Sequence, residues 1–136
     1  MRGNSGLRRA ATPPHFAWAL AIACLMAAAC KPVPSNRYEF DSDAKRRGVV
    51  AIKRLGCGAC HEIPGVDWPK GRTAPSLVGF DDVGVIAGSL PNTPANLAAF
   101  VRNAPKAKPG STMPAMPLTE QEARDVAAYL LGADDA

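Results

Sequence analysis

The sequence contains few aromatic residues and almost no histidine. Only 6% of its 136 residues are aromatic, and its two histidines are His15 and His61. The region after residue 43 has about 90 residues, so its own apolar side chains would form only a thin core. We therefore expect a bound group to supply part of the buried surface. We find no internal repeat and no convincing strand, which excludes repeat architectures and a βαβ unit.

The sequence also lacks an apolar run long enough to span a bilayer comfortably. The longest run, Phe16–Ala29, has 14 residues and follows three arginines near the start. This length and these flanks are typical of a secretory signal peptide, which we predict over 1–29. An uncleaved membrane anchor is the alternative.

The end of this run offers two cleavage patterns. Ala27-Ala28-Ala29-Cys30 resembles a bacterial lipoprotein cleavage site, which would make Cys30 the lipidated N-terminus. The alternative is ordinary A-x-A cleavage, which would release a free product. Under the first interpretation, residues 30–43 are a lipidated cysteine and a flexible, proline-containing linker.

An excess of positive charge is also missing once the leader is removed. Three of the 16 Lys and Arg residues precede Cys30, which leaves 13 against 12 Asp and Glu residues. The remaining chain carries a net charge of +1 rather than +4. With no basic-aromatic pattern, we predict no nucleic-acid partner.

The most informative motif is Cys57-Gly58-Ala59-Cys60-His61. Two thiols three residues apart, followed directly by an imidazole, form the attachment signature for c-type haem. Cys57 and Cys60 would bond the two vinyl groups on one edge of the ring, and His61 would bind iron. A thioredoxin-type redox pair, a disulfide and half of a zinc site are the alternatives. Export would place haem attachment in an oxidising compartment.

The remaining pattern predicts an all-α domain over 44–136, with three main helices and long loops. Capping residues, proline positions and apolar spacing place the helices at 44–55, 93–103 and 119–131. Proline and glycine make 63–80 and 104–118 loops, and 81–90 is a short turn or a broken helical piece. Long loops suit a domain that wraps a disc-shaped cofactor.

A haem iron with one histidine ligand needs a second axial partner or an open position. No other histidine lies in the predicted mature chain, so a methionine thioether is the candidate. Met113 and Met116 both lie in the proline-rich loop before the last helix, and spacing alone does not separate them. In the alternative interpretation, either methionine only fills a gap in the hydrophobic core and does not bind iron.

These residues together resemble class I (monohaem) cytochrome c over about 48–131. The resemblance rests on the haem motif and on Ala74-Pro75-Ser76-Leu77, Pro109-Gly110-Ser111-Thr112-Met113-Pro114 and Asp125-Val126-Ala127-Ala128-Tyr129-Leu130. It implies the cytochrome c fold, with Met113 as the iron ligand and the Pro75 carbonyl accepting from His61 Nδ1. It also implies that Gly48 and Ile52 on the first helix meet Val126 and Tyr129 on the last. Ala74 departs from the family's frequent glycine.

Two further stretches, Ala87-Gly88-Ser89-Leu90-Pro91-Asn92-Thr93-Pro94 and Lys108-Pro109-Gly110, resemble cytochrome c domains that serve bacterial haem–copper oxidases. We find no copper-binding domain of an oxidase subunit in this sequence, so we expect a separate carrier or a small subunit. We therefore expect a single-electron carrier with one covalent haem c, not an enzyme. Its expected partners are a terminal oxidase or an upstream cytochrome complex, on the periplasmic side of a bacterial membrane to which Cys30 anchors it. Without lipidation, it would be soluble in the periplasm.

The rival function is a haem enzyme or a gas or redox sensor with a labile methionine ligand. Four basic residues on the two loops are a hypothetical docking site for an acidic partner: Lys70, Arg72, Lys106 and Lys108. A merely solvated surface explains them equally well.

Overall fold

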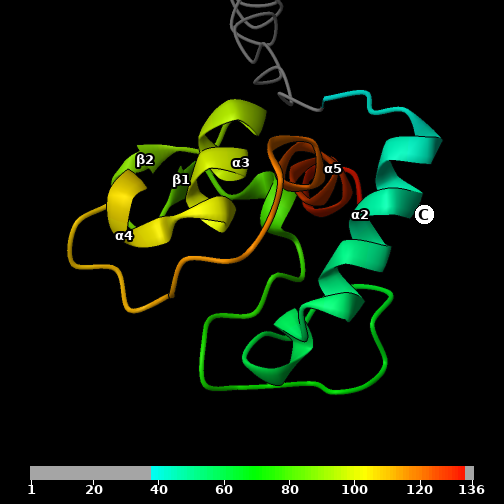
Figure 1. The fold of residues 1–136 in the computed structure, drawn as a ribbon, viewed down its shortest axis with the longest axis horizontal. Helices are drawn as coiled ribbons and strands as arrows, with labels where there is room; N and C mark the ends of the chain where they lie inside the picture. The colour runs from blue at the N-terminus through cyan, green and yellow to red at the C-terminus, as the bar shows by residue number, and fades with distance from the viewer. Residues whose placement is uncertain (1–37, 134–136) are drawn as a thin grey trace, which may run out of the picture. The chain divides into compact units, whose positions relative to one another are not determined.

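A computed structural model describes residues 38–133 of the protein. The predicted signal peptide and Cys30 lie outside these residues. The described chain is mostly helical, with helices α2 (Ser42–Arg54), α3 (Pro94–Arg102), α4 (Ala104–Ala107) and α5 (Glu120–Leu131) (Figure 1). Two 3-10 turns, η1 (Cys57–Ala59) and η2 (Phe80–Asp82), lie between α2 and the short strands β1 (Val85–Ile86) and β2 (Leu90–Pro91).

Helices α3 and α5 begin where the capping signals predict, and α2 begins two residues before its predicted start. The Asp41 side chain accepts from the Asp43 amide at the start of α2, and the Thr93 side chain accepts from the Asn96 amide at the start of α3. Thr119 forms a full capping box at the start of α5. Each cap pairs backbone N–H groups that have no partner within the helix.

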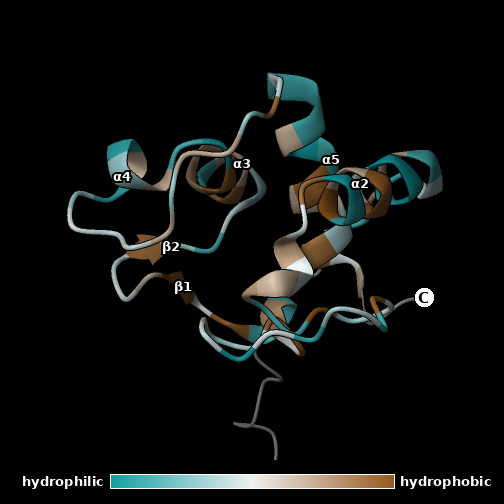
Figure 2. Ribbon diagram, turned by 60° about the horizontal axis from the view of Figure 1, so that its bottom comes forward, coloured by the Kyte–Doolittle hydropathy of each residue, from teal (hydrophilic) through white to brown (hydrophobic). Residues whose placement is uncertain are grey.

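Helix α5 packs against both α2 and α3. Gly48 on α2 lies directly on the α5 backbone, because an added Cβ would be 2.7 Å from the Asp125 carbonyl carbon and 2.9 Å from Tyr129 Cβ. The helix crossing expected at Gly48 is therefore present. Apolar segments of the helices and both strands are visible in Figure 2, and Ile52 and Leu97 are the largest fully buried side chains among the described residues.

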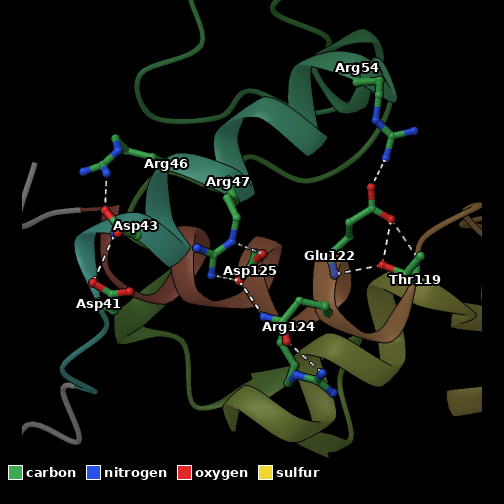
Figure 3. Close-up of polar contacts among 10 residues, drawn as sticks. Asp41, Asp43, Arg46, Arg47, Arg54, Thr119, Glu122, Arg124 and Asp125 are labelled. Carbon is green, nitrogen blue, oxygen red and sulfur yellow. Dashed lines mark hydrogen bonds and ion pairs between the residues drawn. The ribbon is translucent and has the colours of Figure 1, made fainter.

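Polar contacts also join α2 to α5 (Figure 3). Arg47 Nε and Nη2 donate to the two carboxylate oxygens of Asp125 at 2.8 and 2.9 Å, and Asp125 is only 3% exposed. The hydrogen bonds from Arg47 lower the pKa of Asp125 below its usual value, because they stabilise the ionised carboxylate. Arg54 at the end of α2 pairs with Glu122 of the capping box.

Three predictions of local structure are wrong. In the segment 81–90, predicted to be a short turn or a broken helical piece, η2 covers only the start; β1 then pairs antiparallel with β2, which ends at Pro91, with left-handed backbone at Ala87 and Gly88 between them. Helix α4 lies within the predicted loop 104–118, because the Asn103 side chain caps it and Pro105 fits its first turn.

The third error concerns the predicted linker. Helix α2 already begins at Ser42, and Tyr38 and Phe40 pack against the hydrophobic core. Their rings lie 6.0 Å apart. The end of the predicted linker is therefore part of the folded domain, because two aromatic side chains bury more surface there than a solvated tether does.

Candidate functional site

A cavity of about 960 Å³ lies in the described domain, lined mainly by apolar side chains. This volume is at the upper end of the range typical of pockets for organic ligands. Val83 and Val85 are 41% and 46% exposed and both line it. The other large apolar side chains on its wall are Ile52, Leu55, Ile63, Leu77, Phe80, Ile86, Leu97, Phe100, Val101, Leu118 and Leu130. A large apolar group bound here would cover side chains that no protein segment covers.

The cysteine motif forms one part of the cavity wall. Gly56 takes left-handed backbone (φ 67°) just after α2, and the chain turns there into η1. The amides of Cys60 and His61 both donate to the Cys57 carbonyl, at 3.2 and 3.1 Å. This tight turn places Cys57, Cys60 and His61 together on the cavity wall.

The two cysteines do not fit the alternative interpretations. No disulfide joins Cys57 to Cys60, and burial raises the pKa of Cys57 above its usual value. A redox-active pair needs a thiol with a lowered pKa, so this environment does not activate Cys57 as a nucleophile. Within residues 38–133, no cluster of three or more His, Cys, Asp or Glu side chains is arranged to hold a metal ion, as a structural zinc site requires.

One ring nitrogen of His61 is engaged by the following loop. His61 Nδ1 lies 2.7 Å from the Pro75 carbonyl oxygen. A carbonyl only accepts, so Nδ1 carries a proton, and in the neutral ring Nε2 then has the lone pair that binds a metal ion. The Ala74 amide donates to the Cys60 carbonyl at 3.0 Å and the Leu77 amide to the Glu62 carbonyl at 2.8 Å. Ala74 stands where the family frequently has glycine, and its backbone is not left-handed here.

The proline-rich segment between α4 and α5 forms another part of the wall. Met113 and Met116 both line the cavity and are partly buried. The Met116 amide donates to the Arg102 carbonyl at 3.0 Å, which ties that residue to the end of α3. The Met113 amide donates only locally, to the Ser111 hydroxyl at 3.3 Å. Both thioether side chains therefore lie at the cavity. The Met116 backbone is tied to α3, whereas the Met113 backbone has only a local hydrogen bond.

The family model for cytochrome c matches residues 47–134. The chain belongs to the cytochrome c family. The match covers the cavity, the CxxCH motif and the methionine segment. Membership implies a covalently bound haem c, and the cavity fits such a group in size, apolar lining and ligand chemistry.

One curated relative of this cytochrome c is a subunit of an oxidase. It is 36% identical over 85 residues to the cytochrome c oxidase subunit 2 of Alkalihalophilus pseudofirmus, across 62% of this chain and 24% of that protein. The chain thus matches about a quarter of that subunit's length. This likeness agrees with the predicted resemblance to cytochrome c domains of haem–copper oxidases.

Sequence reasoning missed two contacts that shape the site. The Tyr129 hydroxyl donates to the Pro64 carbonyl at 2.6 Å and so ties the loop after the haem motif to α5. Asn92 Nδ2 donates to the carbonyls of Phe80 and Val83, at 2.9 and 2.8 Å. These two bonds fix the backbone of the segment 80–83, which contributes Phe80 and Val83 to the cavity wall. Neither residue had a local pattern that points to a partner so distant in sequence.

The four predicted docking cations do not share one environment. Lys108 lines the cavity and is partly buried, whereas Lys70, Arg72 and Lys106 are exposed.

None of the helices within residues 38–133 is long and apolar enough to cross a membrane.

Proposed function

We propose that this cytochrome c is a single-electron carrier with His61 and Met113 as the axial ligands of one haem. Cys57 and Cys60 would hold the haem through thioether bonds. The observation that carries the proposal is the shared cavity, which both the CxxCH turn and Met113 line. The hydrogen bond from His61 Nδ1 to Pro75 supports it, because it leaves Nε2 available for iron.

A bound haem would supply a reversible one-electron change of iron, without a bond or proton transfer. The protein would hold the iron through His61 and Met113 and keep water away from it. The apolar wall, with Ile52, Leu97 and Leu130 all buried, favours this exclusion. A thioether ligand raises the potential, which suits a carrier that donates electrons to an oxidase.

We assign the electron transfer to a bacterial respiratory chain, to or within a terminal oxidase. The likeness to an oxidase subunit supports this assignment. We place the domain on the periplasmic side of the membrane, with 1–29 as a removed signal peptide and Cys30 as the lipid anchor. The partner is the oxidase or an upstream cytochrome complex, and no nucleic acid is involved.

The ligand assignment is tested by two matched variants of the exported protein, Met113→Ala and Met116→Ala. We expect Met113→Ala to lose the weak near-infrared band of methionine-bound ferric haem and to bind carbon monoxide when reduced, because one axial position opens. Met116→Ala should keep the band and exclude carbon monoxide. The reverse pattern would make Met116 the ligand. Ready binding of carbon monoxide by the unaltered protein would favour the enzyme or sensor function instead.

The anchor is tested separately by Cys30→Ser in the full chain. We expect the wild-type protein in the membrane fraction of the expressing bacterium and the variant in the soluble periplasmic fraction. Both proteins should have the same haem spectrum, because residue 30 precedes the domain. Equal soluble fractions for the two proteins would refute lipidation.

A further inference from the structure

Lys108 places one positive charge on the wall of a largely apolar cavity. Among the described residues that line the cavity, it is the only Lys or Arg, and none is Asp or Glu. Lys108 is partly buried, and its side chain forms no ion pair or hydrogen bond with another described residue. Removing a charge from water costs free energy unless an opposite charge lies nearby. The apolar ring of a haem accounts for the rest of the wall but not for this cation.

The surrounding sequence supplies no counter-ion for Lys108. No Asp or Glu stands between Asp82 and Glu120. Glu120 pairs with Arg102 at 3.1 Å, and Arg102 also donates to the Leu118 carbonyl at 3.2 Å. Because no carboxylate of the described chain lines the cavity, an anion that pairs with Lys108 there must belong to the group that the cavity binds.

A tight turn fixes the backbone of Lys108. Its amide donates to the Ala104 carbonyl at 2.8 Å, and its own carbonyl accepts from the Ser111 amide at 3.1 Å. Pro109 and Gly110 occupy the two central positions of this turn, and Gly110 has left-handed backbone (φ 86°). This order is typical of a type II turn, in which the third residue needs a positive φ. The position of Lys108 on the wall is therefore set by backbone contacts.

The segment that carries Lys108 is also closed at its base. Asn103 and Ala115 form an isolated antiparallel bridge, and the Met116 amide donates to the Arg102 carbonyl at 3.0 Å. Figures 1 and 2 both show α4, which directly precedes Lys108, apart from the end of α2, where the cysteine turn follows. The cation and the attachment cysteines thus come from separate parts of the wall.

We infer that Lys108 binds a propionate carboxylate of the haem and, through that ion pair, raises the reduction potential. The inference rests on the proposed function, because it needs the haem in the cavity. The two propionates are the anionic groups of an otherwise apolar ring, and they lie away from the vinyl groups that the cysteines bond. A bond from an ammonium to a carboxylate is charge-assisted and stronger than a bond between neutral groups.

The effect on the potential follows from the charge of Lys108. Reduction adds one negative charge to the haem, so a nearby cation stabilises the reduced form more than the oxidised form. Salt screens an exposed cation but screens a partly buried one much less. Lys108 therefore acts differently from Lys106, which is exposed and does not line the cavity.

The test is a spectroelectrochemical redox titration of the exported, haem-loaded protein at low and high salt. We expect Lys108→Gln to lower the equilibrium constant for reduction roughly tenfold, which is about 59 mV for one electron. This loss should persist at high salt. Lys108→Arg should retain most of the potential, because it keeps the charge. The resonance Raman band of propionate bending should shift in Lys108→Gln and return towards its wild-type position in Lys108→Arg.

Lys106→Gln is the matched control, because it removes the same charge two residues away from Lys108. Its equilibrium constant for reduction should change by less than about twofold, and this small change should vanish at high salt. All three variants should keep the near-infrared band of methionine-bound ferric haem. A change in potential then reports on the charge and not on a lost axial ligand.

Two results would overturn the ion pair. An equal loss of potential in Lys106→Gln and Lys108→Gln would show only a general effect of surface charge. An unchanged potential and Raman band in Lys108→Gln, with the near-infrared band retained, would remove Lys108 from the propionate and leave the proposed function intact. If the wild type itself lacks the near-infrared band, the proposed axial ligation fails, and the Raman comparison still decides whether Lys108 contacts a propionate.

Discussion

Gly48 offers the sharpest test of how the domain holds its cavity. A methyl group at this position would lie 2.7 Å from the Asp125 carbonyl carbon and 2.9 Å from Tyr129 Cβ. Ordinary carbon contacts are about 3.5–4.0 Å, so α2 and α5 would have to separate by close to 1 Å. The nearest atoms belong to the α5 backbone and cannot rotate away, so the whole helix pair must adjust.

Two effects of Gly48→Ala oppose each other. Alanine favours a helix over glycine by about 0.8–1.0 kcal/mol. Overpacking a helix contact costs about 1–3 kcal/mol, and a gap near 1 Å forfeits up to about half of the dispersion energy across the interface. Because Ile52 and Val126 are both almost fully buried at this interface, we expect the cost to exceed the gain by about 1 kcal/mol.

The assay is thermal and guanidinium unfolding of the haem-loaded protein, followed by circular dichroism. A loss of about 1 kcal/mol corresponds to a Tm lower by roughly 4–8 °C in a domain of this size. Gly84→Ala is the matched control, since a Cβ there meets nothing within 4 Å and Gly84 does not have left-handed backbone. A Gly48→Ala protein as stable as the wild type, or more stable, would show that helix propensity outweighs the crossing and would refute the reasoning.

Two further predictions concern α5. Hydrogen bonds from Arg47 lower the folded-state pKa of Asp125, so its ion pair stabilises the fold above about pH 4 and this contribution is lost as pH falls through the lowered pKa. Asp125→Asn should lower the free energy of unfolding by about 1–3 kcal/mol at pH 7 and weaken the acid dependence of the urea unfolding midpoint. Equal midpoints for the wild type and the variant at every pH would contradict this. Burial raises the pKa of the Tyr129 hydroxyl, which keeps it a donor to Pro64. Tyr129→Phe should therefore lower the free energy of unfolding by about 1 kcal/mol with an unaltered visible spectrum, and an unchanged urea midpoint would show that the bond adds no stability.

The main helices were predictable because each carries its own start signal. Thr93-Pro94 and the Thr119–Glu122 capping box fix their helices within a residue. Asn103-Ala104-Pro105 is a similar signal for α4, but neighbouring prolines outweighed it in the loop prediction. The paired strands could not be predicted, because two residues in each strand are too few to display an alternating pattern.

The candidate site was predictable to a different degree at each residue. Local spacing predicts Cys57, Cys60 and His61 as site residues, whereas only the family resemblance favours Met113 over Met116 as the ligand. The contact between His61 and Pro75 was expected from the same resemblance and is present at 2.7 Å. The ion pair of Arg47 with Asp125 spans 78 residues, and no local pattern reveals such a pairing.

That ion pair also bears on the order in which the domain assembles. The packing of α2 against α5 closes a loop that contains most of the cavity wall, including the methionine segment. Contacts between residues far apart in sequence form late, because the chain must first lose the entropy of bringing its ends together. The CxxCH turn follows α2 directly and needs only local contacts to form. We therefore expect the attachment cysteines to be accessible before the last helix docks, so that haem joins an open chain and the final helix closes the domain around it.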